Sequence, residues 1–191
     1  MTNLTKRALA DSLKKLLSRR PMDRITVQDV TDDAAVSRKT FYYHFHDIYD
    51  LMEWLVVDEC SRFGSPANGS VDWIREVADA LNYARENRGW VLNVYQSVER
   101  EQLERILHRI VGPYVENGFD QAVNGRPVAE EDRKFALAIY THGITGIFLD
   151  WVSAGMRSDT VFLEDNLAHL FQNSLAGIAE RCVAQQAGAN N

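Results

Sequence analysis

Residues 37–45 gather, within nine positions, side chains that suit hydrogen bonding to nucleic acid. The segment reads Ser-Arg-Lys-Thr-Phe-Tyr-Tyr-His-Phe. Arg38 and Lys39 can pair with guanine O6 and N7, and threonine or tyrosine can meet a thymine methyl group or a phosphate oxygen. In a helix, Phe41 and Phe45 face the core and leave the polar side chains outside. The pattern favours a helix that contacts DNA, and composition alone leaves open a solvated helix with a buried phenylalanine pair.

The segments before this one predict two more helices and a tight turn. Four leucines share one face of a first helix, which ends before Pro21: Leu9, Leu13, Leu16 and Leu17. Thr26 with Asp29 resembles a capping box for a short helix over 27–33. The stretch 34–36 breaks the pattern, and Ser37 can cap the next helix. Three short helices with a tight turn describe a helix-turn-helix, whose second member enters the major groove.

The rest of the chain keeps a helical spacing and contains no lasting period of two. We expect a connecting helix over 47–62 and a linker over 64–70. Further helices are expected over 71–86, over 100–110 with a bend or end at Gly112-Pro113, over 129–154 and over 160–183. The sequence therefore predicts an all-α protein with a DNA-binding head (1–50) and a helical effector-binding and dimerisation body (63–191).

Charge separates the two regions. The net charge is −6, yet residues 1–50 hold nine Lys/Arg and seven Asp/Glu, a balance of +2, whereas residues 51–191 hold 12 and 20, a balance of −8. An anionic partner is least repelled by the head. The two cysteines, Cys60 and Cys182, fit a reduced cytosolic protein. No signal-like apolar run opens the sequence and no uncharged run has membrane-spanning length, so we expect a cytoplasmic protein without a membrane partner.

The run Ile-Thr-Val-Gln-Asp-Val (25–30), the run Ala-Ala-Val-Ser-Arg-Lys-Thr-Phe-Tyr-Tyr-His-Phe (34–45) and Leu51 strongly resemble the TetR family of bacterial transcription regulators. The resemblance covers roughly residues 5–55. Residues 6–16, 47–54 and 142–151 further resemble the branch that contains regulators of dihydroxyacetone kinase operons. Some members of that branch are activators that respond to a protein co-activator.

The resemblance implies a homodimer whose two heads read a palindromic operator in double-stranded DNA. It assigns DNA contacts to eight residues: Thr26, Ser37, Arg38, Lys39, Thr40, Tyr42, Tyr43 and His44. Two positions depart from the family pattern. Ala35 replaces the glycine of the turn, which predicts a less sharp or strained turn. Ile48 replaces a lysine, which predicts one lost phosphate contact in each head and a salt slope flatter by about one unit.

The resemblance also implies that the last two long helices pair with their copies in a four-helix bundle. Gly143 and Gly146 lie in mid-helix, where each costs about 1 kcal/mol, and close approach of another helix is the simplest compensation. The last helix carries a broad apolar stripe. The residues expected at the dimer interface are Gly143, Gly146, Phe162, Leu167, Leu170, Phe171, Leu175 and Ile178. The alternative is a core within one chain only.

Polar-tipped aromatic residues in the body exceed what a dry core needs and suggest an effector site. The candidates are Tyr83, Trp90, Tyr95, Tyr114, Tyr140 and His142, with Trp73 and Trp151 as further aromatics. For each one alone, core packing is the plainer interpretation. The effector is a small molecule or a co-activator protein, and a stripe of Trp73, Trp90 and Tyr95 would suit protein docking.

Two other classes of function compete with a transcription regulator. An all-α enzyme finds little support, because His-Glu-x-x-His, a phosphate-cradling glycine loop and Gly-x-Ser-x-Gly are all missing. His142 and Asp150 are two turns apart, too far for a triad. We therefore expect no catalytic residue, no metal and no cofactor. A ligand-binding or adaptor protein with a weakened head is supported only by Ala35 and Ile48.

Overall fold

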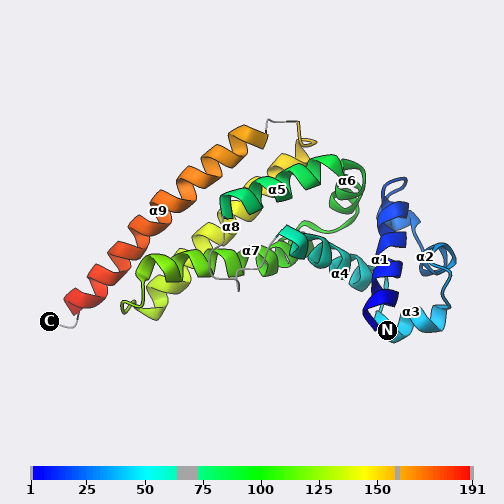
Figure 1. The fold of residues 1–191 in the computed structure, drawn as a ribbon, viewed down its shortest axis with the longest axis horizontal. Coiled ribbons are helices and arrows are strands. Elements are labelled where there is room, and N and C mark those ends of the chain that lie inside the picture. Colours follow the sequence, from blue (N-terminus) through cyan, green and yellow to red (C-terminus); the bar gives the residue numbers. More distant parts are fainter. Residues whose placement is uncertain (1, 64–72, 158–159, 190–191) are drawn as a thin grey trace. The chain divides into compact units, whose positions relative to one another are not determined.

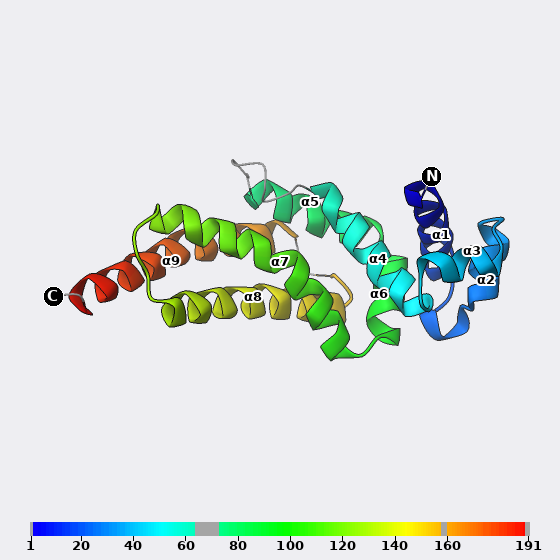
Figure 2. The ribbon, with the colours of Figure 1, turned by 90° about the horizontal axis from the view of Figure 1, so that it is seen from below.

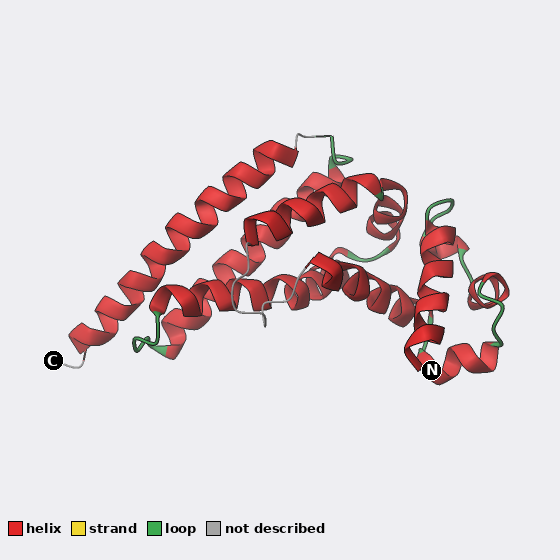
Figure 3. Cartoon of the chain, in the orientation of Figure 1, coloured by secondary structure: helices red, strands yellow, loops and turns green. Residues whose placement is uncertain are grey.

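The computed structural model describes residues 2–63, 73–157 and 160–189, and for parts of α5 and α9 it describes the backbone alone. These segments form helices joined by short loops, without any strand (Figure 3). The prediction of an all-α protein is confirmed. The helices are α1 (Thr2–Leu17), η1 (Met22–Arg24), α2 (Val27–Asp33), α3 (Arg38–His44), α4 (Ile48–Cys60), η2 (Ser61–Phe63), α5 (Trp73–Glu86), α6 (Arg88–Ser97), α7 (Arg100–Val123), α8 (Glu130–Ser153) and α9 (Thr160–Ala189).

The chain divides into two compact units. One holds residues 1–62 and 83–106, and the other holds residues 63–82 and 107–191. In Figure 1 the head helices α1, α2 and α3 lie together beside the N-terminus. Residues 83–106, which the sequence places in the body, pack with the head. The predicted linker over 64–70 lies outside the described residues.

The head is built around the apolar face of α1. Leu9, Leu13 and Leu17 are 0% exposed, and Leu16 is only partly buried. Val30 of α2 and Phe41 of α3 complete the core at the same 0% exposure. Because each of these side chains removes a large apolar surface from water, the helices hold together despite their short length.

Side-chain caps set where the head helices begin. Thr26 and Asp29 form a capping box at the start of α2, in which each side chain bonds the backbone N–H of the other residue. Ser37 accepts from the backbone N–H of Thr40 at the start of α3, and Asp47 accepts from the first turn of α4. These caps satisfy backbone donors that a helix leaves unpaired, so all three predicted starting points are confirmed.

The turn between α2 and α3 is strained at the position that the sequence singles out. Ala35 has φ of +53°, in the left-handed region. An L-residue there brings its Cβ close to the following carbonyl oxygen, which glycine avoids. The strain expected from Ala35 is therefore present in the backbone of the turn.

Helix α6 belongs to the same unit as the head and is tied to it by polar contacts. The Asn93 side-chain amide donates to the Leu17 carbonyl at 2.6 Å, and the Met22 backbone N–H donates to Ser97 Oγ at 3.1 Å. A Cβ added at Gly89 would lie 3.4 Å from the Ser18 carbonyl oxygen. Glycine here lets the start of α6 approach the end of α1 closely.

The second unit has its own apolar core on α7, α8 and α9, and α7 and α8 lie alongside each other (Figure 2). Its buried members are Val115, Phe119, Val123, Ala136, Leu175 and Ala179. The prediction that a helix ends at Gly112-Pro113 is wrong, because α7 runs on to Val123. Pro113 removes one backbone hydrogen bond, and the fully buried Val115 and Phe119 in the following turns compensate for that loss.

Helix α8 is also long and apolar enough to cross a membrane by length and composition, and it is alone in this among the described residues. A helix in the core of a soluble protein passes the same test, so this is weak evidence for a span. Helix α9 runs past its predicted end at residue 183 and reaches Ala189.

Candidate nucleic-acid interface

Helix α3 separates its side chains into a buried edge and an exposed face. Phe41 is 0% exposed and Phe45, its C-cap, is 3% exposed. Tyr42 is 51% exposed and Tyr43 is 79% exposed, the largest value of any apolar or aromatic side chain in the described core and surface set. Large aromatic rings are seldom left in water on a helix of seven residues, so this face is suited to a partner.

Three of the predicted DNA contacts also hold the helix starts. Ser37 Oγ lies 3.1 Å from the Thr40 backbone nitrogen and 2.8 Å from Thr40 Oγ1. Thr26 Oγ1 donates to Asp29 Oδ2 at 2.7 Å and accepts from its backbone N–H at 3.2 Å. These hydroxyls have fixed orientations, and Ser37 and Thr40 lie at the N-terminus of α3, where base contacts are made in helix-turn-helix proteins.

Arg38 extends over its neighbour one turn along the exposed face. Its guanidinium carbon lies 5.9 Å from the centre of the Tyr42 ring, and one amino group lies 3.4 Å from the Tyr42 hydroxyl. The exposed Lys39 adds a second cation to this face. His44 lies at the last position of α3, is half-buried, and packs edge-on against Tyr43 with ring centres 4.9 Å apart. The structure thus brings six predicted residues together on one helix: Arg38, Lys39, Thr40, Tyr42, Tyr43 and His44.

The acidic residues of α2 are paired with cations within the head. Lys15 lies 2.5 Å from Asp33, and Arg20 lies 3.0 Å from Asp29. The Thr26 side chain and backbone, followed by Arg20, lower the pKa of Asp29 to about 2. This neutralisation leaves the charge on the exposed face of α3 positive, as a phosphate-binding surface requires.

Helix α4 begins beside this surface with a capped N-terminus and no lysine. Asp47 Oδ1 accepts from the backbone N–H of Tyr49 at 2.8 Å and of Asp50 at 2.9 Å. The Asp50 N–H above all, with a further contribution from His46, lowers the pKa of Asp47. Ile48 is half-buried at the first position, where it offers no hydrogen-bond donor from its side chain.

The predicted effector residues fall into two groups, one in each unit. Tyr83, Trp90 and Tyr95 belong to the first unit, and Tyr114, Tyr140 and His142 to the second. Trp90 is 6% exposed and its Nε1 has no hydrogen-bond partner. Trp151 is 4% exposed. The side chain of Trp73 lies outside the described residues.

In the second unit, two of these residues have polar partners on other elements or on their own helix. Tyr140 Oη lies 2.8 Å from Ser174 Oγ, which joins α8 to α9. His142 Nδ1 lies 2.8 Å from the Ala138 carbonyl, and its ring packs against His108 of α7 with centres 4.4 Å apart. An effector role for these residues stays a prediction. In the described ranges there is no cluster of three or more residues able to hold a metal ion.

The predicted dimer residues differ in how much surface they leave for a partner. Leu175 is 3% exposed in the core of its own unit, and Ile178 packs against that core. A Cβ built at Gly143 or Gly146 would meet nothing within 4 Å. Close approach of another described helix of this chain is therefore not what those glycines accommodate. The side chains of Phe162, Leu167, Leu170 and Phe171 lie outside the described residues.

Sequence reasoning missed a buried polar cluster that involves α1, α4 and α5. Glu59 is 1% exposed, and Lys14 and Tyr83 bond its carboxylate. A signal was available in the sequence, because Glu59 follows Leu51 and Leu55 at helical spacing on the buried face of α4. A charged residue in that register needs a buried partner, and only the tertiary structure identifies which one.

The fold and the exposed face of α3 define a DNA-binding transcription regulator with a helix-turn-helix head. Comparison with protein families agrees: residues 9–55 match the model for bacterial regulatory proteins of the tetR family, and residues 72–173 match a model for the C-terminal region of transcriptional regulators. The chain belongs to the TetR family.

A curated relative supports the same class. The HTH-type dhaKLM operon transcriptional activator DhaS of Lactococcus lactis subsp. lactis (strain IL1403) is 25% identical over 85 residues, which is 44% of this chain and 46% of that protein. The match thus spans a little under half of the relative's length. A solved structure, the dihydroxyacetone kinase operon activator DhaS, aligns with a TM-score of 0.68 at 19% identity, covering 90% of this chain and 96% of that chain. At this identity the likeness shows the fold.

Proposed function

We propose that this protein is a homodimeric regulator that binds a palindromic operator through α3 and responds to an effector held by its helical body. The observation that carries the proposal is the exposed face of α3, where Arg38, Lys39, Tyr42 and Tyr43 lie outside while Phe41 is buried. In a helix-turn-helix, this is the arrangement that reaches base edges and phosphates in the major groove. A protein of this kind acts in the cytoplasm, where the DNA is.

The second part of the proposal, a homodimer, is supported by α8. Phe135 is 69% exposed, Ile139 45% and Ile147 40%. With Gly143 they recur every four residues and form one stripe along the helix. An apolar stripe of this length is suited to burial against a second copy, and a twofold axis places two recognition helices about 34 Å apart, one turn of duplex.

The third part, an effector, rests on the polar-tipped aromatic residues of both units and on the relative that is an operon activator. An effector changes operator affinity only if it binds one arrangement of the heads better than another. A small molecule and a co-activator protein both satisfy this condition. The half-buried Tyr95, Tyr114 and Tyr140 are the side chains we would first test for contact with it.

Selection of bound duplexes from a random DNA pool at a stated salt concentration tests the proposal. We expect a palindromic consensus with half-sites about one helical turn apart. Tyr43→Ala and Lys39→Ala should each weaken binding at least tenfold and leave the oligomeric state unchanged. Lys134→Ala is the matched control, since this exposed lysine pairs with Glu130 on α8.

Two results would contradict the proposal. Operator affinity of Tyr43→Ala and Lys39→Ala equal to that of Lys134→Ala would remove α3 from the interface. No enrichment of any sequence by a folded dimer, alone or with cell extract, would favour the adaptor protein with a weakened head, which the strained Ala35 and the missing lysine at Ile48 support.

A further inference from the structure

Helix α4 carries a carboxylate in the interior of the first unit. The Glu59 side chain is 2% exposed, and the residue lies in the last turn of α4, on the same face as the buried Leu55 and Met52. Removing a carboxylate from water is costly unless charged or hydrogen-bonding partners replace the lost hydration. The position of Glu59 therefore depends on the partners that it meets there.

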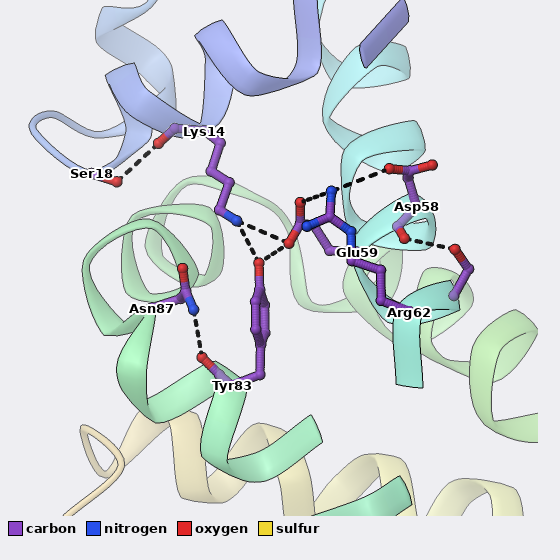
Figure 4. Close-up of polar contacts among 8 residues, drawn as sticks. Lys14, Ser18, Asp58, Glu59, Arg62, Tyr83 and Asn87 are labelled. Carbon is purple, nitrogen blue, oxygen red and sulfur yellow. Dashed lines mark hydrogen bonds and ion pairs between the residues drawn. The ribbon is translucent and has the colours of Figure 1, made fainter. Parts of the chain in front are cut away.

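Three side chains from three helices meet this carboxylate (Figure 4). Lys14 Nζ of α1 lies 2.9 Å from Glu59 Oε2, and the Tyr83 hydroxyl of α5 donates to the same oxygen. Arg62, one turn further along the chain, lies 3.0 Å from the other oxygen. Lys14 Nζ also donates to the Tyr83 hydroxyl at 2.6 Å, which closes a triangle of hydrogen bonds. We call Lys14, Glu59 and Tyr83 the Glu59 cluster.

An aromatic residue of α6 extends the cluster to a fourth helix. Lys14 Nζ lies 5.9 Å from the centre of the Trp90 ring and 5.1 Å from that of Tyr83. Cation–π contacts of this length are stronger when the cation is shielded from water, and the Lys14 side chain is only 22% exposed. Together with the bond from Asn93 to the Leu17 carbonyl, the cluster fixes the second half of α1 to α4, α5 and α6.

The chemistry of the cluster limits how α1 can move against its neighbours. Apolar contacts tolerate sliding, whereas a buried ion pair with further hydrogen bonds keeps its energy in one geometry only. Because α1 forms the core of the head with α2 and α3, fixing α1 fixes the recognition helix as well.

We infer that Glu59 is a positioning residue for DNA binding: through Lys14 and Tyr83 it sets the orientation of the helix-turn-helix head on α4 and α6, and with it the separation of half-sites that the protein accepts. This inference rests on the proposed dimeric operator binding. It assigns to the cluster the selection of operator spacing, and to α3 the selection of base sequence.

Binding to a series of palindromes tests the inference. The half-site sequence is held constant, and the spacer between half-sites is changed one base pair at a time. We expect the wild-type chain to prefer one spacer by at least tenfold over its neighbours. Glu59→Gln and Tyr83→Phe should reduce that preference to about threefold or less, while binding to a single half-site stays within twofold of the wild type. A purely structural loss would lower the active fraction and scale all spacers equally.

Glu101→Gln is the matched control, because Glu101 is 82% exposed and pairs only on the surface with Arg105. Tyr83→Phe keeps the ring and removes one hydroxyl, so it provides the test if Glu59→Gln does not fold. A spacer profile of both variants identical to that of Glu101→Gln overturns the inference alone. A wild-type chain that binds palindromes without any spacer preference, or binds none, overturns the proposed function and this inference with it.

Discussion

At the scale of single residues, the head combines fixed polar groups with one strained backbone position. Ser37, Thr40 and the capping box of Thr26 and Asp29 hold the helix starts by hydrogen bonds that the sequence pattern indicates directly. These interactions are local, within three residues along the chain, and local interactions are the ones that a sequence encodes most plainly. The strain at Ala35 belongs to the same class, because glycine is the usual residue at such a turn.

Ala35→Gly should stabilise the protein. Glycine removes the cost of the left-handed conformation at φ +53° and raises the entropy of the unfolded chain, so a net gain of about 1 kcal/mol is expected. Urea or thermal unfolding followed by circular dichroism measures it, with a rise in melting temperature of about 2–4 °C. Ala34→Gly is the control: Ala34 has φ of −80°, so the same exchange should destabilise. Equal effects at both positions would contradict the assignment of strain to Ala35.

Acid should weaken the capping box of α2. Hydrogen bonds from Thr26, then Arg20, hold the pKa of Asp29 at about 2, below its ordinary value of 3.8. A pKa lowered by folding means that the stabilisation is complete above about pH 4 and disappears as the pH falls towards 2. Urea midpoints of the wild type should exceed those of Asp29→Asn at pH 6, and the difference should shrink steadily between pH 4 and 2. A difference that is constant with pH would refute this.

At the scale of elements, α3 and α4 show what helical periodicity predicts well and what it does not. Spacing placed Phe41 and Phe45 inside and left the polar residues of α3 outside, as observed. The same spacing on α4 places Glu59 among Leu51 and Leu55, yet its partners come from α1 and α5, 45 and 24 residues away along the chain. Periodicity assigns a face to each residue and carries no information about which distant element covers that face.

The start of α4 offers a prediction about phosphate contacts. Ile48→Lys places a cation at the first position of α4, in the head and on the helix that follows α3. We expect tighter operator binding and a salt slope steeper by about 0.9 for each phosphate gained, one in each head. The measurement is operator affinity at several salt concentrations. Val57→Lys adds the same charge to the far half of α4, where Val57 is 38% exposed, and should leave the slope unchanged. Equal slopes for the two variants would mean that residue 48 does not face phosphate.

The continuation of α7 past Pro113 is the clearest error at this scale. A proline inside a helix removes one hydrogen bond and crowds the preceding turn, which favours a helix end in the sequence. Here the turns beyond it carry Val115 and Phe119, which pack against α8 and α9. Tertiary burial outweighs the local cost, and the burial depends on residues 136 and 175, far along the chain.

At the scale of the whole molecule, the proposed regulator works as a pair of chains. Palindromic DNA presents two identical half-sites related by a twofold axis, so a twofold protein reads both with the same residues. The exposed stripe on α8 supplies apolar surface for such a pairing: Phe135, Ile139 and Ile147 are the exposed large apolar residues of that helix. The division of labour would then be sequence reading by α3, spacing by the Glu59 cluster and pairing by α8.

Ile139→Glu should weaken the dimer. The substitution places two unpaired carboxylates, one from each chain, in an apolar contact, which we expect to raise the dissociation constant at least 100-fold. Sedimentation or light scattering over a range of concentrations measures the shift from dimer to monomer. Ala138→Glu serves as the control, because Ala138 is exposed on a neighbouring face of the same helix. A dimer as stable as that of the control would place the interface elsewhere.

Local interactions and periodicity were enough to determine the all-α class, the helix-turn-helix head, the caps at Thr26, Ser37 and Asp47, the strained turn at Ala35 and the outward face of α3. Each of these depends on residues within one or two helical turns of each other. The tertiary structure alone decided that α6 packs with the head, that α7 continues through Pro113, and that Glu59 is buried against Lys14 and Tyr83. Those features arise from contacts between distant segments, where the free energy gained by burial or by pairing a charge exceeds the preferences of the local chain.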